Sequence, residues 1–233
     1  MASDLSVEQI RSYLDHTNVK ADATSEDIEK LCREAQEYGF HSVCLTPHRI
    51  KIAKEFLSGT QTAIICVIGF PFGFTTTLEK INEAKTAVSD GATEIDMVVN
   101  IGEVKEGNFD FVEDEIRQIA EAIKPVGLKV IMEIGFLTKD ELAETCHRAK
   151  SAGAAFVKTA TGYGPRTPTV EDIKIMREAV GPEMGIKASG GIHTLEQANQ
   201  MIEAGATRIG TSSALQIIGI ETKEEKDLAG STE

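Results

Sequence analysis

A short unit recurs along this chain: an amphipathic stretch ends at a glycine, and an apolar, strand-like run follows immediately. The clearest copies contain Gly39, Gly91, Gly153 and Gly205. Glycine commonly follows the last residue of a helix, because it adopts left-handed backbone angles without steric strain. The expected strands lie at 13–17, 39–45, 62–69, 91–99, 128–135, 153–158, 185–189 and 205–210. The unit therefore predicts eight strands, with a connecting segment of helical character between successive strands.

The expected strands are almost continuously apolar, which is typical of a parallel sheet covered by helices on both faces. Thr138 with Glu141, and Thr194 with Gln197, have the spacing of capping boxes at helix starts. This alternation over 233 residues predicts an α/β fold, a (β/α)8 TIM barrel, as a single domain spanning 1–233. We expect a short N-terminal helix at about 6–12 and a flexible C-terminal tail at about 219–233. A doubly wound open sheet is the less favoured alternative, because no Gly-x-Gly-x-x-Gly motif follows the first strand.

Three charged residues interrupt the apolar strands. Asp96 lies within Ile95-Asp96-Met97-Val98-Val99, while Lys158 and Lys187 each lie near the end of a strand. Charged side chains are rarely buried unless they are paired, and an ammonium beside another cation loses its proton more easily. A neutral lysine attacks carbonyl carbons. If the fold brings the three together, they form an amine nucleophile, a cation that tunes it and a carboxylate that moves protons. The alternative is a purely structural salt bridge at the barrel end, with Asp96 or Glu133 as the partner.

Further polar residues lie within or at the end of expected strands, namely Asp15, Thr17, Cys44 and Lys129. Active sites of such barrels lie at the carboxyl ends of the strands, so these residues are candidates for a substrate pocket. Asp15 and Thr17 suit substrate hydroxyls but could equally cap a strand, and Cys44 is interpreted mainly as a small semi-buried residue. The acidic stretch 103–115 is interpreted as solvated surface.

Two glycine- and serine-rich loops follow the seventh and eighth strands: Ser189-Gly190-Gly191 and Gly210-Thr211-Ser212-Ser213. Glycine lets backbone N–H groups approach an oxyanion, and the loops after these two strands often bind phosphate in barrels. The sequence therefore predicts a phosphate site there. Two tight turns with a hydroxyl cap are the alternative.

The composition of the chain limits the kinds of partner that the protein is expected to bind. The chain has 24 Lys and Arg against 37 Asp and Glu, a formal net charge of −13. A surface this acidic disfavours nucleic acid and anionic membranes, so we expect neither as a partner.

The four cysteines and five histidines have no metal-binding spacing, so we expect no metal. The N-terminal sequence shows no signal peptide, and we expect a cytoplasmic protein.

Taken together, these residues resemble deoxyribose-phosphate aldolase, a family of class I aldolases, over about residues 14–217. The likeness is carried by the following stretches: Leu14-Asp-His-Thr17, Ser42-Val-Cys-Leu-Thr-Pro47, Gly69-Phe-Pro-Phe-Gly73, Thr75-Thr-Thr77, Glu94-Ile-Asp-Met-Val-Val-Asn-Ile-Gly102, Phe156-Val-Lys-Thr159, Thr161-Gly162, Ile186-Lys-Ala-Ser-Gly-Gly-Ile192 and Arg208-Ile-Gly-Thr-Ser-Ser213.

The resemblance implies a metal-independent and cofactor-independent aldolase that cleaves 2-deoxyribose 5-phosphate to acetaldehyde and glyceraldehyde 3-phosphate, and also catalyses the reverse addition. Lys158 would form the Schiff base, Lys187 would be the neighbouring cation and Asp96 the proton shuttle. Asp15 and Lys129 would support the proton relay and the substrate hydroxyls, with Cys44 lining the pocket. The residues implied in phosphate binding are Gly162, Gly190, Gly191, Gly210, Ser212 and Ser213. A homodimer or homotetramer is also implied.

The chain departs from the family pattern at a few positions. His193 stands where many members have Arg near the phosphate, and Ile134 replaces a small polar residue, so we expect a more apolar pocket edge there. The tail 226–233 lacks the terminal Tyr that some members use near the active site. Three other readings stay open: a different phosphate-binding Schiff-base barrel, a non-catalytic sugar-phosphate binding barrel and a cofactor-using barrel, for example one that uses flavin.

Overall fold

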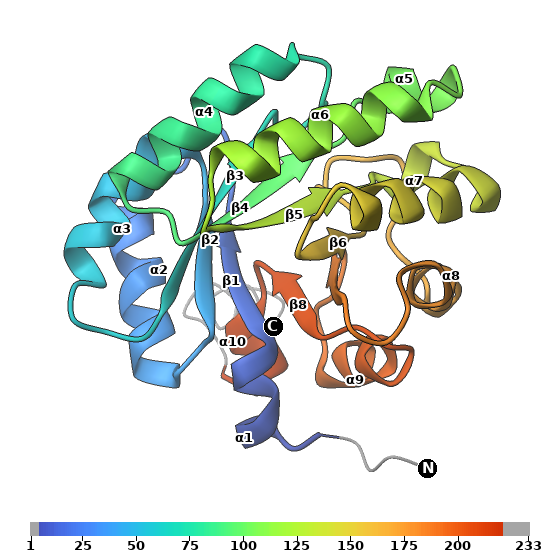
Figure 1. Cartoon of the computed structure of the whole chain (residues 1–233). Helices are drawn as coiled ribbons and strands as arrows, with labels where there is room; N and C mark the ends of the chain where they lie inside the picture. The colour runs from blue at the N-terminus through green and yellow to red at the C-terminus, as the bar shows by residue number, and fades with distance from the viewer. Residues whose placement is uncertain (1–4, 221–233) are drawn as a thin grey trace.

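Eight parallel strands close into a barrel in the computed structural model, which describes residues 5–220 (Figure 1). Each strand pairs with the next along the chain, and β8 pairs with β1. The strands are β1 Leu14–Asn18, β2 Ser42–Leu45, β3 Ala63–Ile68, β4 Glu94–Val98, β5 Gly127–Ile131, β6 Phe156–Lys158, β7 Gly185–Ser189 and β8 Arg208–Thr211. The predicted (β/α)8 barrel is confirmed.

The helices form the outer layer around the strands (Figure 1). The α-helices are α1 Val7–Ile10, α2 Ser25–Tyr38, α3 Ile50–Phe56, α4 Thr77–Asp90, α5 Ile101–Lys105, α6 Phe109–Ala122, α7 Lys139–Ser151, α8 Val170–Val180, α9 Leu195–Glu203 and α10 Ala214–Ile217. Three 3-10 turns are η1 Arg11–Tyr13, η2 Pro47–Arg49 and η3 Ile134–Phe136. The short N-terminal helix is confirmed as α1 and η1. Whether 1–233 acts as one domain stays a prediction, and the tail from 221 onward lies outside the described residues.

Several helices begin at a capping box. Both predicted boxes are present, at Thr138 before α7 and at Thr194 before α9. Thr24 and Thr169 form equivalent boxes before α2 and α8 with an aspartate as the fourth residue. In each box the threonine hydroxyl accepts a bond from a free backbone N–H at the helix start, which fixes where the helix begins.

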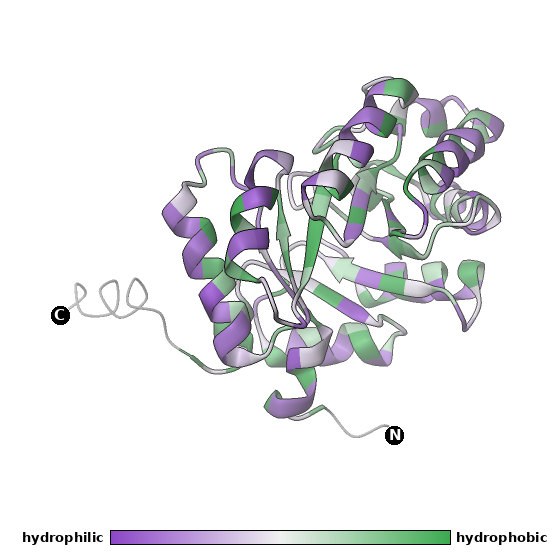
Figure 2. Cartoon of the chain, turned by 60° about the vertical axis from the view of Figure 1, so that its left-hand side comes forward, coloured by the Kyte–Doolittle hydropathy of each residue, from purple (hydrophilic) through white to green (hydrophobic). Residues whose placement is uncertain are grey.

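The main hydrophobic core lies between the barrel wall and the helices. It includes Ile28 and Leu31 of α2, Ile116 of α6 and Val130 of β5, all buried. Hydrophobic positions concentrate on the strands, while the surrounding helices alternate between hydrophilic and hydrophobic positions (Figure 2). This pattern places one apolar face of each helix against the sheet.

The interpretation of 103–115 as solvated surface is wrong for Glu115, which is 1% exposed on α6. Its carboxylate accepts a bond from the Lys80 ammonium at 2.8 Å and from the Thr77 hydroxyl at 3.1 Å. Lys80 of α4 is itself fully buried and also donates to the Val98 carbonyl at 3.0 Å. Charge composition could not reveal this pairing, because the two residues are 35 positions apart and meet only where α4 packs on α6.

Candidate active site

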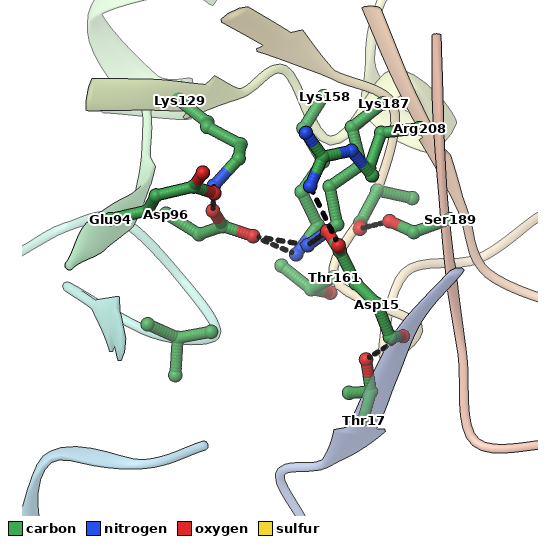
Figure 3. Close-up of polar contacts among 12 residues, drawn as sticks. Asp15, Thr17, Glu94, Asp96, Lys129, Lys158, Thr161, Lys187, Ser189 and Arg208 are labelled. Atoms are coloured by element: carbon green, nitrogen blue, oxygen red, sulfur yellow. Dashed lines mark hydrogen bonds and ion pairs between the residues drawn. The ribbon is translucent and has the colours of Figure 1, made fainter. Parts of the chain in front are cut away.

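Three lysines meet one carboxylate inside the barrel (Figure 3). Oδ2 of Asp96, on β4, lies 2.9 Å from Nζ of Lys158 on β6 and 2.9 Å from Nζ of Lys187 on β7. Its Oδ1 accepts a bond from Nζ of Lys129 on β5 at 3.0 Å. The strand register accounts for this meeting, because Lys158 pairs with Lys187 across β6 and β7, and Asp96 pairs with Lys129 across β4 and β5.

Asp15 of β1 closes the cluster on the other side of Lys187. Its Oδ2 lies 2.7 Å from Nζ of Lys187. Its Oδ1 accepts bonds from the Ser42 hydroxyl at 2.7 Å and from Nη1 of Arg208 at 3.2 Å. Lys187 therefore lies between two carboxylates, and it has no exposed surface.

Gly210 leaves the space that Lys187 occupies. A Cβ at position 210 would lie 2.8 Å from Cε of Lys187 and 2.9 Å from Cβ of Ser189. Any larger residue would push the lysine away from the carboxylates. The side chain of Lys187 thus gives Gly210 a packing role, whatever its backbone also contributes to ligand binding.

The mutual charges decide the protonation of the cluster. Burial alone raises the pKa of Asp96, but the ammonium groups of Lys129, Lys158 and Lys187 outweigh burial and hold that pKa well below its ordinary value. The pKa of Asp15 is lowered for the same reason, because Lys187, Lys129 and Arg208 outweigh its burial. Burial lowers the pKa of Lys187, yet Asp15 and Asp96 outweigh it and raise the pKa above its ordinary value. Lys187 is therefore fixed as a cation between two anions.

Lys158 has a different environment. It is 4% exposed, and its one ion-pair partner among the described residues, Asp96, is shared with Lys129 and Lys187. It also lines a cavity of about 800 Å³ at the carboxyl end of the barrel. Of the three lysines, it has the least anionic compensation and the most direct access to a ligand.

The cavity brings together most of the predicted substrate residues. Those that line it are Thr17, Lys158, Gly162, Gly190, Gly191, Gly210, Ser212 and Ser213. The two predicted phosphate loops therefore face the same space as Lys158. By contrast, Asp15, Cys44, Asp96, Lys129 and Lys187 do not line the cavity and are buried below it.

Two of these deeper residues have surroundings that sequence reasoning did not anticipate. Cys44 packs against Ile65 and Val67 in a small apolar cluster, and burial raises the pKa of its thiol. Asp15 contacts Lys187, Ser42 and Arg208 and has no exposed surface, so it is separated from a ligand in the cavity by its burial rather than by a lack of free acceptor sites.

The model of the DeoC/LacD family of aldolases matches residues 10–219. The chain belongs to this family. It is 54% identical over 212 residues to the deoxyribose-phosphate aldolase of Aciduliprofundum boonei, covering 90% of this chain and 96% of that protein. It is 53% identical to the deoxyribose-phosphate aldolase of Thermococcus gammatolerans, covering 90% and 95% of the two chains.

A solved structure gives the same result. The deoxyribose phosphate aldolase of Aeropyrum pernix, described as a unique tetramer, superposes with a TM-score of 0.86 at 33% identity, covering 91% of each chain. Within residues 5–220, no helix is both long and apolar enough to span a membrane. Over the same residues, no group of three or more His, Cys, Asp or Glu is arranged to hold a metal ion.

The loops of this family member are held in place by buried polar groups. Glu133, with a φ of 51°, is 1% exposed and accepts bonds from the backbone N–H of Thr161 at 3.1 Å and from the Thr161 hydroxyl. The Ser189 hydroxyl donates to the Ala160 carbonyl at 2.7 Å. These contacts tie the loop after β6 to its neighbours and place Gly162 at the cavity.

The structure places the two residues that depart from the family pattern, His193 and Ile134, in different surroundings. His193 lines the cavity, and its Nδ1 lies 2.9 Å from Oγ of Ser213, as expected of a residue beside the phosphate loops. Ile134 is fully buried in the main core and does not line the cavity. The expected more apolar pocket edge at Ile134 is therefore wrong, because this side chain points into the protein.

Sequence reasoning assigned no role to Glu94 and Arg208, although both belong to the charged cluster. Glu94 forms an ion pair with Lys129, and Arg208 lies 3.2 Å from Asp15. A usable signal was present, because side chains two positions apart on a strand point to the same face. Glu94 precedes Asp96 by two residues, and Arg208 precedes Gly210 by two.

Proposed function

We propose that this chain is a 2-deoxy-D-ribose 5-phosphate aldolase, in which Lys158 carries the substrate as a Schiff base. The observation that carries the proposal is the position of Lys158. Its side chain lines the cavity, and its Nζ contacts Asp96, a carboxylate that two further lysines share. The closely similar aldolases of Aciduliprofundum and Thermococcus support this substrate.

Lys158 begins the reaction as a neutral amine. Within the cluster, Lys129, Lys158, Lys187 and Arg208 carry four positive charges against the three negative charges of Asp15, Glu94 and Asp96. Of the three lysines, Lys158 has the fewest carboxylate partners among residues 5–220, and it is the one that lines the cavity. The amine adds to the substrate aldehyde, and loss of water gives an iminium ion on Nζ.

The iminium ion then acts as an electron sink. A base removes the proton of the 3-hydroxyl, the C2–C3 bond breaks, and its electron pair forms an enamine with the lysine nitrogen. Glyceraldehyde 3-phosphate leaves. Protonation of the enamine carbon and hydrolysis of the resulting iminium ion release acetaldehyde and the free amine. Asp96 and Lys187 are proposed to transfer these protons, because one oxygen of Asp96 lies 2.9 Å from both amines.

The substrate phosphate is proposed to bind at the loops after β7 and β8. Gly190, Gly191, Ser212 and Ser213 line the cavity together with Lys158, and backbone N–H groups in glycine-rich loops bind phosphate oxygens well. Gly162 and Gly210 line the same space and are proposed to complete the phosphate site, while Thr17 is proposed to face the substrate hydroxyls. Asp15 and Lys129 are proposed to support the proton relay from below the cavity, through their contacts with Lys187 and Asp96 respectively. Cys44 packs beneath the pocket. No metal or cofactor enters the scheme.

We also propose that the protein is a cytoplasmic homodimer or homotetramer that does not bind nucleic acid. The tetrameric Aeropyrum relative supports assembly, and the net charge of −13 disfavours polyanionic partners.

The test is reduction with borohydride in the presence of acetaldehyde, followed by peptide mass mapping. We expect a two-carbon adduct on Lys158, and release of glyceraldehyde 3-phosphate from deoxyribose 5-phosphate in a coupled assay. Lys158→Ala should give no adduct and no turnover. Lys139→Ala, which removes an exposed lysine at the start of α7, is the matched control and should keep both.

Two results would contradict the proposal. Folded wild-type protein that forms no adduct on Lys158 has no Schiff-base mechanism at this residue. Lys158→Ala protein that retains full turnover has a different nucleophile.

A further inference from the structure

We propose that Glu94 is a positioning residue that acts through Lys129 on Asp96, from the amino-terminal end of the barrel. The inference rests on the proposed function, because that function assigns Asp96 a part in the proton transfers at Lys158. The inference adds a residue at the opposite end of the strands from the cavity to the groups that affect the reaction.

Lys129 bridges two carboxylates of the same strand. Its ammonium forms an ion pair with Oε2 of Glu94 and donates to Oδ1 of Asp96 at 3.0 Å. Glu94 and Asp96 are two residues apart on β4, a rise of roughly 7 Å along a strand. Lys129 is 1% exposed, so both contacts are made away from bulk water.

This bridge orients the Asp96 carboxylate. Because Lys129 occupies Oδ1, Oδ2 is directed toward Lys158 and Lys187, each at 2.9 Å (Figure 3). If Glu94 lost its charge, Asp96 would be the remaining ion-pair partner of Lys129 among the described residues. The ammonium of Lys129 would then be drawn toward Asp96 and would compete with the other two lysines for it.

The surroundings of Glu94 favour a charged carboxylate. His41, in the turn before β2, has its Nε2 3.8 Å from Oε1 of Glu94. Burial raises the pKa of Glu94, but His41, Lys129 and Arg208 together outweigh it and lower that pKa to about 2. The side chain of Glu94 is 23% exposed, so it reaches solvent at the end of the barrel opposite the cavity.

The packing at this end of the barrel holds the bridge in position. The Phe156 ring lies beneath two cations, with Nζ of Lys129 and Cζ of Arg208 each 5.7 Å from its centroid. Gly185 makes room for this ring, because a Cβ there would lie 2.2 Å from Cε1 of Phe156. Arg208 in turn contacts Asp15, the second partner of Lys187. Each carboxylate beside Lys187 is thus held by a cation on its far side.

The charge of Glu94 also affects the reactive amine. Its removal makes the cluster around the amine of Lys158 more positive by one charge. Removal of the Lys129 charge has the opposite effect. Below the amine lie Lys187 and Asp15, whose charges are fixed by their pairing, and the Cys44 thiol, whose pKa burial raises. The titratable side chains that line the cavity with Lys158 are His16, Lys20, Asp27, Lys30, Glu34, Tyr163 and His193.

The test compares Glu94→Gln with Lys129→Met and the wild-type protein over a range of pH. In Glu94→Gln we expect kcat to fall at least tenfold, KM for deoxyribose 5-phosphate to stay within about twofold, and the acidic limb of kcat/KM to move to lower pH. In Lys129→Met the acidic limb should move to higher pH. Glu106→Gln removes the same charge from the exposed end of α5 and should change none of these values.

Borohydride trapping with acetaldehyde distinguishes a failure of the proposed function from a failure of the role proposed for Glu94. Wild-type protein without an adduct on Lys158 contradicts the proposed function itself. Active wild-type protein with an adduct, together with a Glu94→Gln variant of unchanged kcat and pH profile, contradicts only the inference. If Glu94→Gln does not fold, the shift in Lys129→Met decides, and an unchanged acidic limb there overturns the inference.

Discussion

Lys158 and Lys187 contact the same oxygen of Asp96, yet their surroundings give them different chemistry. Lys187 has a second carboxylate, Asp15, at 2.7 Å and no exposed surface. Among residues 5–220, the shared carboxylate is the one ion-pair partner of Lys158, which also lines the cavity. The same residue type is therefore a fixed cation in one place and a candidate nucleophile in the other, because the count of neighbouring anions differs.

This difference predicts the effect of Lys187→Leu. The ammonium of Lys187 lies 2.9 Å from Oδ2 of Asp96, and the two are proposed to transfer protons together, so removal of the lysine interrupts that transfer. We expect kcat to fall by about 100-fold or more, in the range of proton-transfer catalysis. Steady-state kinetics measure the loss, and circular dichroism checks that the barrel is folded. A folded variant with wild-type kcat would refute the role given to Lys187.

At the scale of elements, two short loops carry the expected phosphate site. The loop after β7 and the loop after β8 face one cavity because their strands are neighbours in the barrel. Their contacts reinforce this position: the Thr211 hydroxyl donates to the Ile192 carbonyl at 2.7 Å, and the backbone N–H of Ser213 donates to the Thr211 hydroxyl at 2.9 Å. The loops are thus linked before any ligand arrives.

Replacement of both Ser212 and Ser213 by alanine should weaken phosphate binding specifically. Each lost hydroxyl removes a hydrogen bond to a charged group, worth about 1.5–3 kcal/mol, so we expect KM for deoxyribose 5-phosphate to rise at least tenfold. KM for unphosphorylated deoxyribose should change little. Ser12→Ala, in η1 at the N-terminal end of the chain, serves as the control. An unchanged KM for the phosphorylated sugar in the double variant would place the phosphate elsewhere.

At the scale of the whole molecule, the barrel interior combines charge with burial. Most TIM barrels fill this space with branched apolar side chains. Here Asp15, Asp96, Lys129 and Lys187 are all at most 1% exposed. Each of these charges is compatible with the fold only because an opposite charge meets it, so the stability of the protein depends on their ionisation.

The pH dependence of stability follows from the direction of these pKa changes. Folding lowers the pKa of Asp15 and Asp96 from 3.8, and that of Glu94 from 4.5 to about 2. Groups with a lowered folded-state pKa stabilise the protein fully above about pH 4.5 and lose this contribution as the pH falls toward 2. The raised pKa of Lys187 has the opposite sign, so its contribution is complete below pH 10.5 and is lost above it.

We therefore expect the urea midpoint to be nearly constant around neutral pH and to fall steeply below pH 4.5. Glu94 alone should contribute on the order of 3 kcal/mol to this fall. Urea titrations between pH 7 and pH 2 measure it, and Glu94→Gln should show a shallower decline in that window. Equal declines in the variant and the wild-type protein would mean that Glu94 is not stabilised by its partners.

The sequence by itself determined the architecture, because glycine after each helix and apolar runs between helices are local signals. It also pointed to Lys158, Lys187 and Asp96, because a charge in an apolar strand needs a partner or a function. Family resemblance then added the substrate and the proposed residue roles. These signals are carried by neighbouring residues, so they can be read without coordinates.

Only the tertiary structure decided which charges meet. The pairing of Asp15 with Lys187, of Glu94 with Lys129 and of Lys80 with Glu115 joins residues far apart in the chain. The tertiary structure also decided that Ile134 faces the core and that Asp15 lies below the cavity. The physical reason is that strand register and barrel closure set these distances, and both depend on how all eight strands pair.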